Sequence, residues 1–480
     1  MHRTFVAGWL ALALPAAAVA QAPAPIDTAR IDSLVTTDMA ARHLVGLSVG
    51  VMRDGQVVFV RGYGTANRAT GLSVDTLTRF AIGSVTKQFT CAIILQLAAE
   101  GKLSVDDPVS KYFPDLTRAA DITLRDLMGH VAGYPDYYPL DFVDRRMLRP
   151  ISADSLIRWY GRLPLDFDPG TRWSYSNTGF IMLGRIAERV TGRPLERLLR
   201  ERLFQPLGMR HTDFEPARRG AAYAQGYASF ALSDMEPAEP EASGWAAAAG
   251  GIWSTPSDLL IWDRALMDGR VVAAPYFAQM TSPRQLANGS STGYGFGLGI
   301  GMVGADTLLS HGGAVSGFNA ANQMIPASRS AVVALANAET NINTGFLRRM
   351  TVPFHPAPPR DTTRPRPPAP AGEPRPVPRV EGVTATEQAT MLLHQLQAGQ
   401  VDRAALADEL SWWLTDARVR GAQLRLGPLG EPTRTIETSR GERGGLEVTT
   451  TRFSFGTRSL TALMYREPSG KVQEYLINEP

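Results

Sequence analysis

Eleven prolines within the 26 residues from Pro353 to Pro378 divide this chain of 480 residues into two unequal parts. Proline holds φ at about −65° and donates no backbone hydrogen bond, so a stretch this rich in it, mixed with Arg and Ala, favours an extended polyproline linker. We therefore predict a linker over 353–380, between a body over 21–352 and a tail over 381–480 that has its own apolar periodicity.

The first 20 residues have the pattern of a cleavable export signal. They open with Arg3, continue as an apolar run from Phe5 to Leu14 and end on the small residues Ala18 to Ala20. This order is typical of a secretory signal peptide, and the run is too short to span a bilayer. We expect cleavage after Ala20, a periplasmic or secreted protein, and no integral membrane segment after cleavage.

Charge, cysteine and histidine content exclude several classes of protein. Forty-nine basic and forty-six acidic residues leave a net charge of +3, which is too balanced for a general nucleic-acid binder. The single cysteine, Cys91, excludes an internal disulfide framework. The seven histidines show no spacing that would ligate zinc, so we expect neither a metal nor a cofactor.

Strand patterns lie at both ends of the body, with helical patterns and long loops over 102–280 between them. A helix over 26–42 with Asp27 as N-cap comes first, and Asp54-Gly55 is a strong hairpin turn. The expected strands are 45–52, 57–63, 295–302, 307–310, 319–325 and 331–337, followed by a helix near 342–349. This pattern predicts one sheet completed by both ends of the body and flanked by a helical lobe.

The tail shows helical spacing first and strand patterns afterwards. One helix contains Met391 and Leu396, and a second ends near Leu414. The expected strands are 424–426, 433–437, 446–455, 460–465 and 472–477. We predict a small α+β domain whose role is packing, the rim of a substrate site or partner binding.

The segment Ser84-Val85-Thr86-Lys87 opens an apolar helix that is expected to stop at Gly101. Residues three apart on a helix share a face, so the Lys87 amine can approach the Ser84 hydroxyl. A hydroxyl needs a neighbouring base to become a nucleophile, and a lysine is such a base only where its surroundings lower its pKa. Ser84 is the candidate nucleophile and Lys87 the candidate base, although so loose a pattern also arises by chance.

Tyr175-Ser176-Asn177 precedes an amphipathic helix expected over 179–190. Near a Ser–Lys pair, a tyrosine would offer a proton relay and an asparagine would offer an amide that orients a substrate carbonyl. Taken alone, this short pattern is equally compatible with a tyrosine that only packs in a loop.

His311-Gly312-Gly313 ends a predicted strand and is followed by Ala314. The glycines would allow close approach of the backbone to a ligand. A backbone N–H there could join that of Ser84 in binding an oxyanion. Taken alone, the segment is also compatible with a glycine-rich surface turn.

In the order S-x-x-K, Y-x-N and H-G-G, these elements resemble the three active-site motifs of the penicillin-recognising serine hydrolases, in particular the family of class C β-lactamases, D-alanyl carboxypeptidases and related esterases. The resemblance spans roughly residues 28 to 350 and includes four connecting segments, at 101–109, 122–127, 206–209 and 254–259. It implies an α/β fold in which an antiparallel sheet is flanked by helices and joined to an all-helical lobe.

The resemblance also implies a role for each residue. Ser84 would be the acylated nucleophile, Lys87 the base and Tyr175 the proton shuttle. The substrate would be bound by Asn177, His311, Gly312 and Gly313, and the oxyanion hole would be formed by the N–H groups of Ser84 and Ala314.

The third motif departs from the commoner form of the family, in which a lysine provides a fixed cation near the substrate carboxylate. His311 is expected to be largely neutral at pH 7, which weakens the β-lactamase interpretation unless an arginine elsewhere holds that carboxylate. Three functions stay open: an acyl-enzyme hydrolase of esters, amides or D-amino-acid peptides, a true β-lactamase, and a non-catalytic homologue that binds a cell-wall precursor or ligand. The complete Ser-Lys-Tyr set argues against the last, and the oligomeric state is left open.

Other candidate residues have simpler explanations. Ser48 lies in the G-x-S-x-G pattern of residues 46–50, but that pattern marks a nucleophile only where a strand turns into a helix, and here a hairpin follows. His130 and His211 are expected to be structural. Cys91, on the helix that Ser84 opens, is expected to be a small core residue.

Overall fold

The computed structural model describes residues 27–138, 143–217, 219–339, 347 and 377–479. The expected signal peptide over 1–20, the linker up to residue 376 and, apart from Leu347, the expected helix near 342–349 lie outside the described residues. None of the described helices is both long and apolar enough to cross a membrane.

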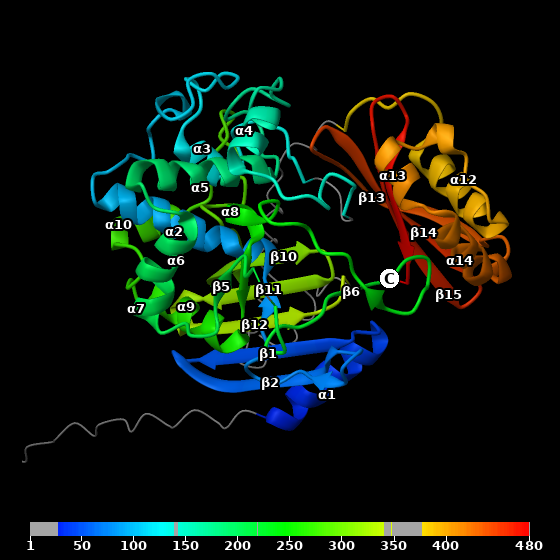
Figure 1. The fold of residues 1–480 in the computed structure, drawn as a ribbon, viewed down its shortest axis with the longest axis horizontal. Coiled ribbons are helices and arrows are strands. Elements are labelled where there is room, and N and C mark those ends of the chain that lie inside the picture. Colours follow the sequence, from blue (N-terminus) through cyan, green and yellow to red (C-terminus); the bar gives the residue numbers. More distant parts are fainter. Residues whose placement is uncertain (1–26, 139–142, 218, 340–346, 348–376, 480) are drawn as a thin grey trace, which may run out of the picture.

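A seven-stranded antiparallel sheet forms the centre of the body, in the order β3-β2-β1-β12-β11-β10-β9 (Figure 1). Its strands are β1 (Gly46–Arg53), β2 (Gln56–Asn67), β3 (Leu72–Ser73), β9 (Gly299–Val303), β10 (Asp306–Val315), β11 (Phe318–Ile325) and β12 (Ser330–Ala336). The first strand pairs with the last, with Val49 opposite Ala334. Both ends of the body therefore complete one sheet, which confirms the sequence-based prediction.

Local sequence explains the first hairpin and the helix before it. Asp54 and Gly55 both have positive φ, 52° and 73°, and such a pair matches the right-handed twist of the flanking strands. Helix α1 (Thr28–Ala41) begins at Asp27, whose side chain accepts a hydrogen bond from the Arg30 N–H at 2.9 Å. The predicted hairpin and N-cap are thus confirmed.

Helices cover both faces of the sheet. On one face, Ile31 and Val35 of α1 pack in a buried cluster with Val49 and Val332. On the other face, α9 (Pro256–Met267) lies against β1 and β12. The strands of the centre are buried on both sides, as the uninterrupted burial of β12 shows.

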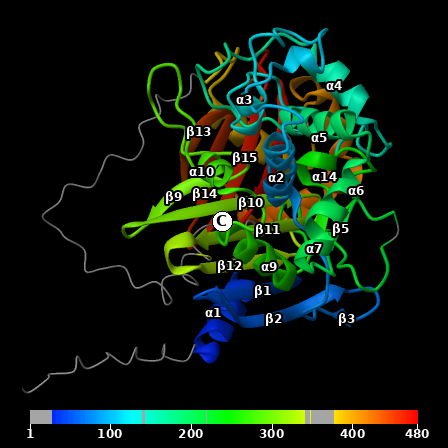
Figure 2. The ribbon, with the colours of Figure 1, turned by 90° about the vertical axis from the view of Figure 1, so that its left-hand side faces the viewer.

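A helical lobe lies beyond the β10 side of the sheet, away from β2 (Figures 1 and 2). The other helices of the body are α2 (Thr86–Ala99), α3 (Leu124–Met128), α4 (Ala153–Gly161), α5 (Asn177–Thr191), α6 (Leu195–Leu199), α7 (Gln205–Leu207), α8 (Ala247–Gly250) and α10 (Ala274–Met280). The same stretch holds two small sheets, formed by β4 (Phe80–Ala81), β5 (Asp213–Phe214) and β8 (Ile252–Ser254), and by β6 (Tyr227–Ala228) and β7 (Glu236–Pro237).

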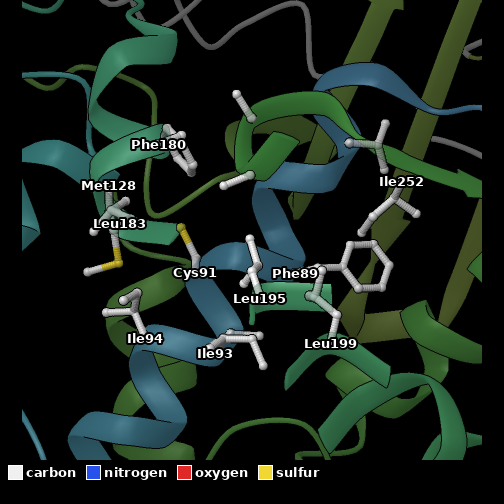
Figure 3. Close-up of a cluster of buried hydrophobic side chains, with 14 of the residues drawn as sticks. Phe89, Cys91, Ile93, Ile94, Met128, Phe180, Leu183, Leu195, Leu199 and Ile252 are labelled. Atoms are coloured by element: carbon white, nitrogen blue, oxygen red, sulfur yellow. The ribbon is translucent and has the colours of Figure 1, made fainter. Parts of the chain in front are cut away.

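Helix α2 is buried on all sides at the centre of the body, as expected for a helix that is apolar all round. Figure 3 shows Cys91 of α2 among side chains from α3, α5 and α6, including Met128, Leu183 and Leu195. Cys91 is therefore the small core residue that the sequence predicts. This packing fixes the helix that follows Ser84.

The tail forms a second, smaller unit with its own hydrophobic core, which includes Leu392, Leu410, Phe453 and Tyr475. Its four-stranded antiparallel sheet consists of β13 (Arg434–Arg443), β14 (Leu446–Phe455), β15 (Arg458–Arg466) and β16 (Val472–Asn478). Its helices are α12 (Ala385–Ala398), α13 (Asp408–Trp413) and α14 (Asp416–Leu426). Figure 1 shows this small α+β domain beside the body, in orange and red.

Three of the predicted strands need correction. The run 424–426 is not a strand but the last turn of α14, where Val419, Ala422 and Leu426 bury one helical face and Leu424 is 77% exposed. Its alternating Leu-Arg-Leu pattern is too short to distinguish the period of a helix from that of a strand. The strand expected over 295–302 begins only at Gly299, and the one expected over 307–310 continues to Val315 because it keeps pairing with β11.

Candidate active site

All three sequence motifs meet at one cavity of about 840 Å³. The cavity is lined by Ser84, Tyr175, Asn177 and the segment 311–314, which lie far apart in the sequence. Its size is typical of a site for a small molecule or a short peptide. The structure thus brings together the residues that the sequence singles out.

The amine of Lys87 is held by three oxygens. It donates hydrogen bonds to Ser84 Oγ at 3.0 Å, to Asn177 Oδ1 at 2.7 Å and to the Ala249 carbonyl at 2.9 Å. Ser84 itself lies in a short 3₁₀ turn over Gly83–Val85, one step before α2 begins. When the amine loses a proton, the amide and carbonyl oxygens can keep its two N–H groups, which turns the lone pair toward Ser84.

Burial makes Lys87 a usable base at neutral pH. The side chain is fully buried. Desolvation lowers the pKa of Lys87 to about 7, against the opposing effect of Asp136 and with a further lowering from Arg443. The ammonium form is partly compensated by the rings of Tyr175 and Phe180, whose centroids lie 4.8 and 5.2 Å from Nζ.

Tyr175 is a neutral phenol at the same point. Burial raises its pKa above the usual range, and the Ser84 side chain beside it has the opposite, smaller effect. Its hydroxyl has no hydrogen-bond partner among the described residues, so in this geometry it faces Ser84 without being bonded to it. A phenol in this position can pass a proton once a substrate is present.

Asn177, the first residue of α5, is fixed by the carboxylate of Asp136. Its Nδ2 donates to both carboxylate oxygens, at 3.1 and 3.2 Å, and its backbone N–H donates to Oδ1 at 3.0 Å. This leaves Oδ1 of Asn177 directed at Lys87. Both ends of the amide are thus engaged within the protein, and orientation of a substrate by Asn177 stays a prediction.

Sequence analysis missed Asp136. It lies alone in the loop segment Tyr134-Pro135-Asp136-Tyr137-Tyr138, with no motif around it, yet its carboxylate is fully buried beside the site. No pattern of spacing could have identified it, because its importance depends on contacts with residues far away in the sequence.

Strand β10 passes against the backbone of the Ser84 turn. A Cβ atom at Gly313 would lie 2.0 Å from the Ile82 carbonyl oxygen and 3.0 Å from the Ser84 nitrogen. Only glycine permits this approach, whereas a Cβ at Gly312 would meet only the Ala320 carbonyl oxygen, at 3.8 Å. The expected pairing of the Ser84 and Ala314 N–H groups as an oxyanion hole is compatible with this contact and stays a prediction.

His311 is held as a neutral imidazole. Its Nδ1 is hydrogen-bonded to the Gly312 carbonyl, which can only accept, so Nδ1 carries the proton. Its Nε2 therefore accepts a hydrogen bond from the Tyr294 hydroxyl, at 2.7 Å. Burial, together with the nearby Lys87, lowers the pKa of His311 to about 4. The third motif therefore contributes no cation at pH 7.

The remaining candidates, Ser48, His130 and His211, do not line the cavity. Ser48 is buried within β1, and the cavity is lined by other residues. His130 accepts the Ser176 N–H on Nδ1 at 3.1 Å, and its ring lies 4.3 Å from that of Tyr175. His211 donates its backbone N–H to Asp258 at 2.7 Å. Of the three, His130 alone packs against a residue of the site.

The C-terminal domain forms part of the wall of the same cavity. The segment 439–443 of β13 lines it, together with Val448 of β14. Arg443 donates to the Tyr138 carbonyl at 3.1 Å, and its Nη2 is 4.0 Å from an oxygen of Asp136. Of the roles considered for the tail, this geometry fits the rim of a substrate site.

Comparison with known proteins places the body in a family. The family model for β-lactamases matches residues 31–353. A D-aminopeptidase of Brucella anthropi is 30% identical over 331 residues, which cover 68% of this chain and 62% of that protein, so less than two thirds of that relative is spanned. The putative penicillin-binding protein PbpX of Bacillus subtilis is 29% identical over 296 residues, 62% of this chain and 71% of PbpX.

Solved structures support the same family assignment. A D-stereospecific amidohydrolase from Streptomyces has a TM-score of 0.60 and 25% identity and covers 69% of this chain and 99% of its own. A D-amino acid amidase from Ochrobactrum anthropi has a TM-score of 0.56 and 26% identity, over 64% and 92%. The octameric penicillin-binding protein homologue from Pyrococcus abyssi shares the fold alone, at 20% identity and a TM-score of 0.62, over 94% and 100%. This chain belongs to the β-lactamase family of serine hydrolases.

Proposed function

We propose that the protein hydrolyses the amide or peptide bond of a D-amino-acid derivative through an acyl-enzyme on Ser84. The observation that carries this proposal is the buried Lys87 amine, hydrogen-bonded to Ser84 at 3.0 Å and held with a pKa of about 7. The choice of substrate is supported by relatives named as D-aminopeptidase, D-stereospecific amidohydrolase and D-amino acid amidase.

In the acylation step, Ser84 Oγ forms a bond to the substrate carbonyl carbon while its proton moves to the neutral amine of Lys87. The carbonyl oxygen takes the negative charge, toward the N–H groups of Ser84 and Ala314. Asn177 and the Ala249 carbonyl hold the other two protons of the amine throughout, because both already accept from it.

The tetrahedral intermediate then collapses by breaking the bond from carbon to the leaving nitrogen. That nitrogen needs a proton, which Tyr175 donates while it is replenished from Lys87. A water molecule next attacks the ester carbonyl and gives a proton to Lys87. The second tetrahedral intermediate collapses by breaking the bond between its carbon and Ser84 Oγ, which takes the proton back from Lys87, and the acid product is released from the free enzyme.

The β-lactamase alternative is tested on the same protein. A neutral His311 cannot supply the fixed cation of the third motif, so we expect turnover of an uncharged D-amino-acid amide or ester to exceed that of a cephalosporin. A cephalosporin turned over as fast as the amide would instead support the β-lactamase alternative.

We also propose that residues 1–20 are removed on export and that the mature chain consists of the hydrolase body over 21–352, the linker over 353–380 and the C-terminal domain over 381–480. The pattern of the first 20 residues supports the first point. Sequencing of the N-terminus of the mature protein tests it, and an intact Met1 would contradict it.

The decisive experiment compares two serines. Ser84→Ala should abolish both the hydrolysis of D-amino-acid amides and covalent labelling by a fluorophosphonate, because Ser84 is the hydroxyl that Lys87 contacts. Ser48→Ala is the control and should retain both, since Ser48 is buried in β1. Labelling that persists in the Ser84 variant would overturn the proposal.

A further inference from the structure

Arg443 reaches the catalytic body from the end of β13, although it belongs to the C-terminal sheet. Its Nη2 donates to the carbonyl of Tyr138 at 3.1 Å, in the loop that carries Asp136. Its Nη1 donates to Tyr465 of β15, at 3.1 Å. The guanidinium is thus anchored on both sides of the boundary between the two domains.

A continuous polar path leads from this guanidinium to the nucleophile. Arg443 is 4.0 Å from Asp136, which accepts from Asn177. Asn177 in turn accepts from Lys87 at 2.7 Å, and Lys87 contacts Ser84 at 3.0 Å. Each link except the first is a hydrogen bond, and the first is a charge pair.

We propose that Arg443 is a positioning residue for the Ser84 site, acting through Asp136 and Asn177 on Lys87. This inference rests on the proposed function, in which Lys87 is the base. It assigns to the C-terminal domain a part in catalysis, since that domain supplies a charge without which the path ends on a buried carboxylate.

The energetic argument begins with Asp136. Its side chain is fully buried, and a buried charge is strongly unfavourable unless it is paired and hydrogen-bonded. Asn177 and the Tyr138 N–H supply hydrogen bonds, and Arg443 supplies the opposite charge. Paired with Arg443, the Asp136 carboxylate holds the Asn177 amide in the one orientation that presents Oδ1 to Lys87.

The charges around Lys87 make the effect of Arg443 measurable. Asp136 stabilises the protonated amine, whereas Arg443 opposes protonation. Groups facing Lys87 that are neutral at pH 7 are Cys91, His130, Tyr175 and His311. Among the described residues, Asp136 and Arg443 are therefore the ionised pair that sets the balance, and removing either should move the titration of Lys87 in a known direction.

The experiment measures kcat/KM against pH for three variants of the full chain, with a D-alanyl anilide as substrate. In the unchanged protein the acidic limb should lie near pH 7, because activity needs the neutral amine of Lys87. Arg443→Gln should move that limb upward by roughly 0.5 to 1 unit, and Asp136→Asn should move it downward. Arg443→Lys keeps the charge and should leave the limb within about 0.3 unit of its original position.

A control and a second substrate separate positioning from other roles. Arg434→Gln, at the exposed start of β13, should leave the limb and kcat/KM unchanged. A D-alanyl anilide with a carboxylate on its leaving group should lose as much kcat/KM in Arg443→Gln as the plain anilide does. A loss confined to the carboxylated substrate would show that Arg443 binds substrate directly and would overturn the proposal.

Two further outcomes would also overturn it: an unmoved acidic limb in Arg443→Gln, or limbs that move in the same direction in Arg443→Gln and Asp136→Asn, as general damage to the fold would cause. If Arg443→Gln fails to fold by thermal melting, Arg443→Met takes its place and the same upward shift is expected of it, whereas Arg443→Lys should still leave the limb unmoved. Failure of the proposed function is distinguishable, because in that case Ser84→Ala would retain activity whatever the Arg443 variants do.

Discussion

The two walls of the cavity are built in opposite ways. On the side of the body, Ser84 and Lys87 are three residues apart at the start of α2, and their contact follows from local geometry. On the other side, the segment 439–443 reaches the cavity only because a separate four-stranded sheet docks against the body. The contact between Ser84 and Lys87 is thus encoded locally, whereas the shape and charge of the site depend on how two domains fit together.

The first prediction attacks the locally encoded wall, where the largest effect is expected. Lys87→Met keeps the length of the side chain and removes the base, so kcat/KM for a D-amino-acid amide should fall by about 10³-fold or more. Lys102→Met, at an exposed position paired with Glu100, is the control and should keep full activity. A Lys87 variant within tenfold of the unchanged protein would show that the base lies elsewhere.

The second prediction concerns the close contact between β10 and the Ser84 turn. Gly313→Ala would place a methyl group 2.0 Å from the Ile82 carbonyl, so we expect a loss of about 2 to 3 kcal/mol in the free energy of unfolding. The methyl group should also push β10 away from the Ser84 turn and so displace the Ala314 N–H. We therefore expect kcat to fall by about 10²-fold, as it does when an oxyanion donor is lost.

Gly312→Ala is the matched comparison for stability. Its methyl group would meet only the Ala320 carbonyl oxygen, at 3.8 Å, so urea denaturation should show a change below about 1 kcal/mol. Equal destabilisation of the two variants would show that the close contact between Gly313 and the Ile82 carbonyl is not the cause of the loss of stability.

The third prediction addresses the wall supplied by the C-terminal domain, where the smallest effect is expected. A Cβ at Gly441 meets nothing within 4 Å, and Gly441 lines the cavity. Gly441→Leu should therefore leave the melting temperature unchanged and raise KM for a D-phenylalanine amide by about fivefold, while KM for a D-alanine amide stays the same.

Gly301→Leu is the control for this wall. Gly301 is an exposed strand residue that, like Gly441, has nothing within 4 Å of a Cβ, but it lies on β9, outside the lining of the cavity. Its KM values should match those of the unchanged protein. An equal rise for the large and the small amide in Gly441→Leu would show that β13 does not limit the size of the substrate.

The sequence predicts the parts of the site that lie in short motifs, and it misses those that arise from packing. Ser84, Lys87, Tyr175 and His311 could be singled out because each stands at a recognisable spacing beside a predicted helix or strand. Asp136 and Arg443 carry no such signal, since each is an isolated charged residue whose partner comes from another domain.

The same distinction explains the success and failure of the fold prediction. The Asp54-Gly55 hairpin was predictable because a turn defines it locally, and β12 because its residues from Ala331 to Ala336 form a short apolar run. The end of α14 was not predictable, because the three residues from Leu424 to Leu426 are too few to reveal a helical period. His130 was expected to be structural, and its packing against Tyr175 could not be predicted because it depends on the folded lobe.

The pairing of β1 with β12 has a consequence for how the newly synthesised chain folds. Strand β1 pairs on one side with β12, in which Ala336 lies opposite Leu47. Because β12 lies near the far end of the body, β1 has no partner on that side until β12 has been synthesised. Contacts so distant along the chain slow folding and leave strand edges exposed while the chain is being synthesised. The segment that completes the Ser84 site, at Gly313 and Ala314, belongs to the same late-arriving strands. A partly synthesised chain therefore holds Ser84 without the backbone of β10 beside it, and the proposed hydrolysis would begin only when nearly all of the body has been synthesised.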